Sequence, residues 1–182
     1  MKIFKKIYLI IFLTIIFSIS HSDVSSASDN SLPSLVGKWA SPPKVILCSS
    51  LNIKRGRMEK TLYYWEKLGY RFGAVIYAEV ENKSCIFGPS VGEITIDIPG
   101  QSFDFEKIAI STTSRIKGSS EIVFAHIQIQ QNSVSKERVL EHEIGHALGW
   151  GHSKRKYHIM NESWVDGGHN SYGLSYKNYK IY

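Results

Sequence analysis

The pattern of apolar and polar positions predicts a domain in which strands and helices alternate from residue 44 onward. Residues 44–48 form a short apolar run, which is typical of a buried strand. Residues 55–70 repeat apolar side chains at helical spacing, and Gly69 follows the last of them, which predicts an amphipathic helix. Four further segments carry the β-branched or alternating patterns of strands: 72–80, 92–98, 107–112 and 121–130.

The last of these strands leads into a second predicted helix. Alternation places every second residue from Val123 to Ile129, all of them apolar, on one face of the strand. His126 lies on the other face, which predicts an ordinary strand histidine. Ser135 is a suitable N-cap for the helix that follows, and apolar side chains between Val139 and Leu148 would bury that helix against the sheet. This order of elements implies an α+β domain, with helices packed on a mixed sheet.

The first 22 residues differ in character from the rest of the chain. Three lysines precede a mostly apolar run at residues 7–17, and small polar residues follow. This is the order of regions in a secretory signal peptide, and we expect cleavage after Ser20 or Ser22. An uncleaved membrane anchor is the alternative, although the apolar run is shorter than the roughly 20 residues of a usual membrane span.

Length and charge favour one exported domain. The chain has 182 residues, and we assign residues 1–22 to the signal peptide, residues 23–43 to a flexible leader rich in serine, and residues 44–182 to the folded domain. The net charge is +6, and removal of three lysines with the signal peptide leaves 19 basic and 16 acidic residues, or +3. No basic cluster indicates nucleic acid binding. We expect a secreted monomer without membrane contact after signal cleavage.

The candidate chemistry is concentrated in the segment L-E-H-E-I-G-H-A-L-G-W-G-H, which ends at His152. His142 and His146 are four residues apart, so a helix places them on one face, where both can bind one metal ion. Glu143 lies between them and would flank the metal as a general base. Gly149 allows the helix to end in a left-handed turn, after which His152 can supply a third imidazole. Three imidazoles with one open position are typical of catalytic zinc.

This segment resembles the extended signature of the metzincin zinc peptidases, H-E-x-x-H-x-x-G-x-x-H followed by a methionine turn. The resemblance implies that Met160 lies beneath the histidines as an apolar floor and does not bind the metal. Ser153, directly after the third histidine, and the ending from Leu174 to Tyr182 are similar to the matrixin branch. The resemblance further implies a mostly parallel five-stranded sheet with an antiparallel edge strand, two main helices and a short C-terminal helix.

The same resemblance implies where a substrate would bind. The predicted strand 107–112 is similar to the family's edge strand, so Ala109, Ile110 and Ser111 would hold an extended polypeptide. Trp164 falls in the region that walls the family's pocket for the residue after the scissile bond, and a tryptophan that fills the core is an equal alternative. One catalytic Zn²⁺ ion is implied. Calcium is not indicated, and because residues 44–125 contain no H-x-D segment we do not expect a second zinc ion.

Cys48 and Cys85 are the two cysteines of the chain. An even number of cysteines in an exported chain favours a disulfide. The alternative is that one thiolate binds the zinc in a latent form of the protein. Both residues lie inside the predicted domain, however, and not in its leader.

Together these patterns and the metzincin resemblance predict a secreted zinc endopeptidase with Glu143 as general base. Two alternatives stay open: an inactive secreted binding protein that zinc only stabilises, and a zinc amide hydrolase with a non-peptide substrate. The presence of Glu143 argues against the first, because a structural zinc site has no use for a base. His158 and His169 lie near the motif without ligand spacing, and a role for either in holding the transition state is a further hypothesis.

Overall fold

The computed structural model describes residues 31–178, and the predicted signal peptide lies outside them. The chain begins with β1 (Lys44–Cys48), α1 (Arg55–Glu66), β2 (Val75–Ala78) and the short α2 (Lys83–Ile86). It continues through β3 (Glu93–Asp97), β4 (Ala109–Arg115), β5 (Ile122–Ile129) and the 3-10 turn η1 (Gln131–Ser133) to α3 (Val139–Ala147). A second 3-10 turn, η2 (Tyr176–Asn178), forms the short C-terminal helix. No helix within this described part has the length and apolar character that a membrane span requires.

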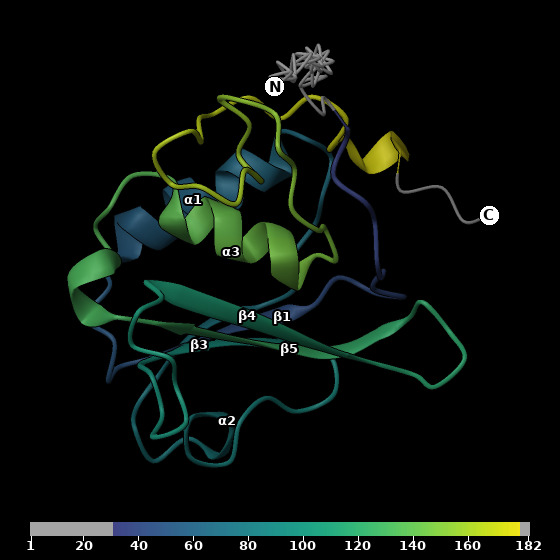
Figure 1. Ribbon diagram of the computed structural model, residues 1–182. Helices are drawn as coiled ribbons and strands as arrows, with labels where there is room; N and C mark the ends of the chain where they lie inside the picture. Colours follow the sequence, from purple (N-terminus) through teal and green to yellow (C-terminus); the bar gives the residue numbers. More distant parts are fainter. Residues whose placement is uncertain (1–30, 179–182) are drawn as a thin grey trace, which may run out of the picture.

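The strands form one five-stranded sheet in the order β2-β1-β3-β5-β4. The pairs β1–β2, β1–β3 and β3–β5 are parallel, and β4 runs antiparallel to β5 at one edge of the sheet. Helices α1 and α3 lie over one face, whereas α2 and its loops lie on the opposite side (Figure 1). The structure therefore confirms the predicted α+β class, with a mostly parallel sheet, an antiparallel edge strand and two main helices.

The core fills the space between the sheet and the two main helices. Trp65 of α1 is fully buried, and its indole N–H donates to the carbonyl of Glu141 in α3 at 2.9 Å, so the two helices are joined by a hydrogen bond as well as by packing. The apolar side chains that form this core alternate along the strands and recur at helical spacing: Val45, Leu47, Ile94, Ile96, Ala125, Ile127, Met58, Leu62, Leu140 and Ile144. The patterns that predicted the elements thus also define the core.

The predicted alternation in β5 holds from Ala125 onward and fails at its beginning. Ser114 of β4 pairs with Phe124, but the next pair joins Arg115 to Ile122, so Val123 is an extra residue in the strand. Such a bulge reverses the faces of the residues before it. Ile122 is consequently buried in the position predicted for Val123, which is only half-buried.

The predicted N-cap at Ser135 is wrong, because α3 begins only at Val139. The segment before it continues as turns, with the amide of Lys136 donating to the carbonyl of Ser133 at 3.1 Å. Val134 is buried in the core, which holds this segment in its turns. Arg138 then takes the N-cap position in a left-handed conformation with φ 71°, without a side-chain cap.

Residues 34–39, here called the N-terminal arm, are attached to the domain. The amide of Val36 donates to the carbonyl of Gly149, and the amide of Gly151 donates to the carbonyl of Ser34, both at 2.8 Å. The indole of Trp39 donates to the carbonyl of Ala147, also at 2.8 Å. The flexible leader predicted for residues 23–43 is therefore wrong for the arm, because backbone groups at the end of α3 bind it.

Candidate metal centre and substrate cleft

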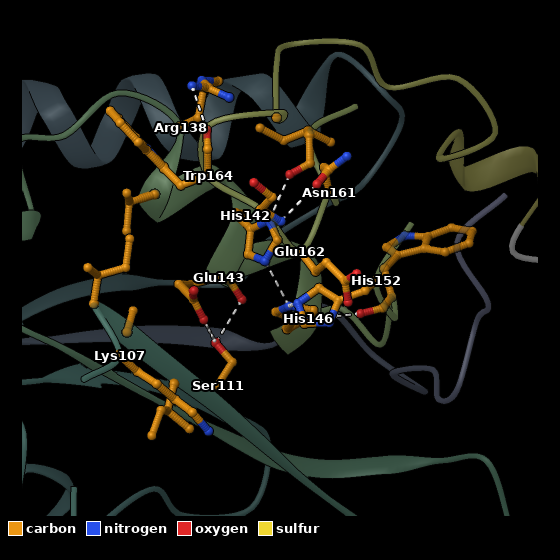
Figure 2. A pocket seen from close by; sticks show the side chains of 18 of the residues that line it. Lys107, Ser111, Arg138, His142, Glu143, His146, His152, Asn161, Glu162 and Trp164 are labelled. Atoms are coloured by element: carbon orange, nitrogen blue, oxygen red, sulfur yellow. Dashed lines mark hydrogen bonds between the residues drawn. The ribbon is translucent and has the colours of Figure 1, made fainter. Parts of the chain in front are cut away.

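Helix α3 and the turn after it bring three histidines together. His142 and His146 lie on one face of the helix, and Gly149 ends it with φ +100°, which reverses the chain toward His152. The Nε2 atom of His146 lies 3.0 Å from that of His142 and 3.1 Å from that of His152 (Figure 2). One nitrogen from each ring lies within 4.8 Å of the other two, so the three imidazoles could hold one metal ion.

Backbone carbonyls fix the orientation of two of these rings. Nδ1 of His142 lies 2.7 Å from the carbonyl oxygen of Ile159, and Nδ1 of His146 lies 2.7 Å from that of Trp150. A carbonyl only accepts, so each Nδ1 carries the proton and each Nε2 presents a lone pair to the centre. Lone pairs this close repel one another unless a cation lies between them. The donor set therefore fits a zinc ion.

Burial keeps the imidazoles of His142 and His146 neutral. Burial lowers the pKa of His142 to about 4, and the nearby rings of His152 and His158 act in the same direction. Burial lowers the pKa of His146 to about 3, and the neighbouring His142 lowers it further. Both rings therefore carry free Nε2 lone pairs at neutral pH, which is the form that binds metal.

Glu143 lies next to the centre without belonging to it. Glu143 is 6% exposed, and its side chain accepts a hydrogen bond from the Ser111 hydroxyl, with Oγ 2.7 Å from Oε2. Burial raises the pKa of Glu143 to about 7, and the hydrogen bond from Ser111 opposes that rise. A carboxyl group with a pKa near 7 can both take and return a proton at neutral pH.

Helix α3 lies directly on the turn that contains Met160. Met160 is fully buried, and a Cβ atom at Gly145 would overlap its sulfur and lie 2.8 Å from Cζ2 of Trp65. Only glycine at position 145 allows this approach. The close packing of Met160 on α3 thus depends on Gly145, which stands inside the motif as H-E-I-G-H and whose role the spacing of the histidines does not reveal.

A cleft of about 690 Å³ runs past the three histidines, between β4 and the segment after Met160. Ala109, Ile110 and Ser111 line it from β4. Trp164 lines the opposite side and is 48% exposed, so it is not part of the core. All four residues predicted to contact substrate therefore lie along the cleft.

The comparison with protein families agrees with this geometry. The model of the matrixin family matches residues 80–180, which is more than half of the chain and includes β4, α3 and the methionine turn. The chain belongs to the matrixin family. Matrixins are zinc metallopeptidases, and the His142, His146 and His152 triad of this matrixin could bind the zinc ion. A search of the curated proteins returned no match.

Two further histidines of this matrixin, His158 and His169, do not line the cleft. His158 is fully buried, its Nδ1 accepts a hydrogen bond from the Met160 amide at 3.0 Å, and its Nε2 donates to the carbonyl of Tyr172 at 3.0 Å. His169 lies at the surface, with Nε2 2.7 Å from Oε1 of Glu137. His158 therefore stabilises the methionine turn, and His169 makes a contact at the surface. Neither makes a hydrogen bond to Glu143 or to the three histidines of the centre.

The two cysteines of this matrixin form the predicted disulfide. Cys48 and Cys85 are joined at an S–S distance of 2.04 Å, with their Cα atoms 5.7 Å apart. The bridge attaches α2 to the end of β1. Since both sulfurs are in this bond, neither cysteine acts as the zinc ligand of a latent form.

Proposed function

We propose that this matrixin is a secreted zinc-dependent endopeptidase that hydrolyses peptide bonds with Glu143 as general base. The observation that supports this most strongly is the convergence of three Nε2 atoms beside a buried carboxyl group at the wall of an open cleft. His142, His146 and His152 would hold one zinc ion. When bound there, zinc supplies a Lewis acid that activates water and polarises the scissile carbonyl.

Glu143 would perform the proton transfers of the reaction. Its carboxylate takes a proton from the attacking water and then delivers that proton to the leaving amine. The raised pKa of Glu143, which burial causes, suits both steps near neutral pH. A structural zinc site would gain nothing from a buried carboxyl group in this position, which argues against an inactive binding protein.

Strand β4 would bind the substrate backbone. Its partner β5 lies on one side only, so the other side of β4 is the edge that lines the cleft. The amide of Gln130 donates to the carbonyl of Ile108, and alternation along an antiparallel pair then directs the backbone groups of Ala109 and Ser111 toward the open edge. An extended peptide could pair with these groups as an added strand, which favours a polypeptide over a small amide.

Purified protein incubated with a quenched peptide library tests this proposal. We expect cleavage that a chelator abolishes and zinc restores, with about one zinc ion per chain by metal analysis. Glu143→Ala should lower kcat by at least about 100-fold, since a positioned general base contributes about 10²–10⁴-fold. Glu59→Ala removes an exposed carboxylate from α1 and serves as the matched control. Cleavage that a chelator does not affect would exclude the proposal.

Export is a separate part of the proposal. A signal peptide at residues 1–22 and a disulfide in the domain both suit an exported protein. Mass spectrometry of the mature protein should find an N-terminus after Ser20 or Ser22. A mature chain that retains residues 1–22 would instead support a membrane anchor. Analytical ultracentrifugation tests the expected monomer.

A further inference from the structure

Ser111 connects the edge strand of the cleft to the proposed general base. Its Oγ lies 2.7 Å from Oε2 of Glu143 and 3.1 Å from the backbone carbonyl oxygen of the same residue (Figure 2). A hydroxyl has one hydrogen to donate. The contact to Oε2 is the shorter of the two, so the hydrogen points to the carboxylate.

This hydrogen bond restricts the orientation of the carboxylate. A glutamate side chain has three rotatable bonds, and without a partner its carboxylate would take several orientations. With Oε2 held by Ser111, the other oxygen, Oε1, is left to accept a proton from water. A base fixed in this way needs less reorganisation during the reaction.

Ser111 is itself held in place by the sheet. It lies in the middle of β4, opposite Ile127 of β5, a fully buried residue of the core. By the alternation described above, its backbone N–H and C=O face the open edge, where a peptide would pair. The strand that would align the scissile bond therefore also carries the group that aligns the base.

We propose that Ser111 is a positioning residue for the hydrolysis: its hydroxyl holds the Glu143 carboxylate in its working orientation, and its backbone faces the substrate. Ser111 thus acts through Glu143 and does not itself exchange a proton with the substrate. This inference deepens the proposed peptidase function and rests on it. It goes beyond backbone binding, because it assigns a role to the Ser111 side chain.

Three variants separate this role from a merely structural one. Ser111→Ala removes the donor, and we expect kcat to fall by about 10–100-fold, the range for loss of a hydrogen bond to a charged group, with KM unchanged within about twofold. Ser111→Thr keeps a hydroxyl on a β-branched side chain that suits a strand, and should recover most of kcat. Thr112→Ala removes an exposed hydroxyl from the next residue, which does not line the cleft, and should leave kcat unchanged.

The Ser111→Ala protein should still bind one zinc ion per chain. A Ser111→Ala kcat equal to that of the parent would overturn the proposal. The proposal would also be overturned if Ser111→Thr lost as much kcat as Ser111→Ala while both variants kept the melting temperature and zinc content of the parent.

Crystal structures of the parent and Ser111→Ala proteins provide a readout that does not depend on activity. We expect one orientation of the Glu143 carboxylate in the parent and several in the variant, and the same single orientation in both would overturn the inference. If the parent cleaves no peptide, the peptidase function fails, whereas this comparison still decides whether Ser111 positions Glu143.

Discussion

Gly145 in α3 lies so close to Met160 that a Cβ atom at position 145 would overlap the Met160 sulfur. The helix that carries two of the histidines therefore lies directly on the methionine turn. The Ile159 carbonyl, one residue before Met160, accepts the hydrogen bond from Nδ1 of His142. A change in the distance between α3 and this turn would consequently alter the orientation of one imidazole of the triad.

Gly145→Ala should lower the free energy of unfolding by about 1–3 kcal/mol, the usual cost of overfilling a packed core. The added methyl group can be accommodated only if Met160 or Trp65 moves, and both are fully buried. Because the shift reaches the His142 contact, we also expect weaker zinc binding. Chemical denaturation and a competitive zinc chelator measure the two effects.

Gly56→Ala is the matched control. Gly56 lies in the first turn of α1, and a Cβ atom there meets nothing within 4 Å. Alanine favours a helix by about 1 kcal/mol over glycine, so this variant should be as stable as the parent or more stable. If both glycine variants behaved alike, the close approach of α3 to Met160 would not explain the loss at position 145.

Arg57→Ala should destabilise the protein by about 3 kcal/mol, the lower end for breaking a buried ion pair. Arg57 in α1 makes hydrogen bonds of 2.6 and 2.8 Å to the two carboxylate oxygens of Glu141 in α3, and the Glu141 side chain is only 7% exposed. Without Arg57, the carboxylate stays buried with a neutral partner, the hydroxyl of Thr61. Urea denaturation measures the change.

The exposed ion pair between Lys107 and Asp104 provides a comparison. Its atoms lie 3.8 Å apart, and both side chains are at least half exposed. Exposed pairs contribute about 0–1 kcal/mol, so Asp104→Asn should leave the free energy of unfolding almost unchanged. If Arg57→Ala and Asp104→Asn lowered the free energy of unfolding equally, burial of Glu141 would not explain the strength of its ion pair.

Acid should destabilise the folded protein partly through His158. Burial lowers the pKa of this imidazole below its usual value of 6.5, and the charge of Arg155 adds to that effect, while the hydrogen bond to the Tyr172 carbonyl opposes it. The unfolded chain therefore takes up a proton at a higher pH than the folded chain does. The stability that depends on the neutral ring is complete above pH 6.5 and is lost as the pH falls toward the folded pKa.

Unfolding free energies between pH 7.5 and pH 5 test this expectation, with His158→Gln beside the parent. The variant should be less stable at pH 7.5, because its hydrogen bonds to the methionine turn change. Its stability should nevertheless fall less steeply with acid than that of the parent. Parallel curves for the two proteins would show that His158 does not titrate on unfolding in this range.

The disulfide should stabilise the domain without contributing to the metal centre. Cys48 and Cys85 are 37 residues apart, and closing a loop of that length stabilises by about 3–4 kcal/mol. The double variant Cys48→Ala, Cys85→Ala should lose this amount in thermal denaturation. It should keep one zinc ion per chain, because α2 lies on the side of the sheet opposite α3 (Figure 1). Loss of zinc from the folded double variant would contradict this separation.

The sheet and the histidine triad could be predicted because local rules determine them. Alternating or continuous apolar runs identified all five strands, and the four-residue spacing of His142 and His146 identified one helical face. The glycine at 149 predicted the reversal that the structure shows. Each of these inferences needs only residues that are close together in the sequence.

The contacts that the sequence did not predict join distant segments through groups that have no apolar pattern. Apart from the indole of Trp39, the arm binds through backbone amides and carbonyls, which carry no sequence pattern. The bond between Ser111 and Glu143 spans 32 residues and depends on how α3 lies over β4. The error at Ser135 has a related cause, because a good capping residue cannot override the burial of Val134 beside it.

The attachment of the N-terminal arm limits how far the mature chain can be trimmed. Gly151 donates its amide to Ser34 and directly precedes His152. Proteolysis ahead of Ser34 leaves these contacts in place. Removal of the chain as far as Trp39 would delete these contacts, and we expect it to loosen the segment that carries the third imidazole.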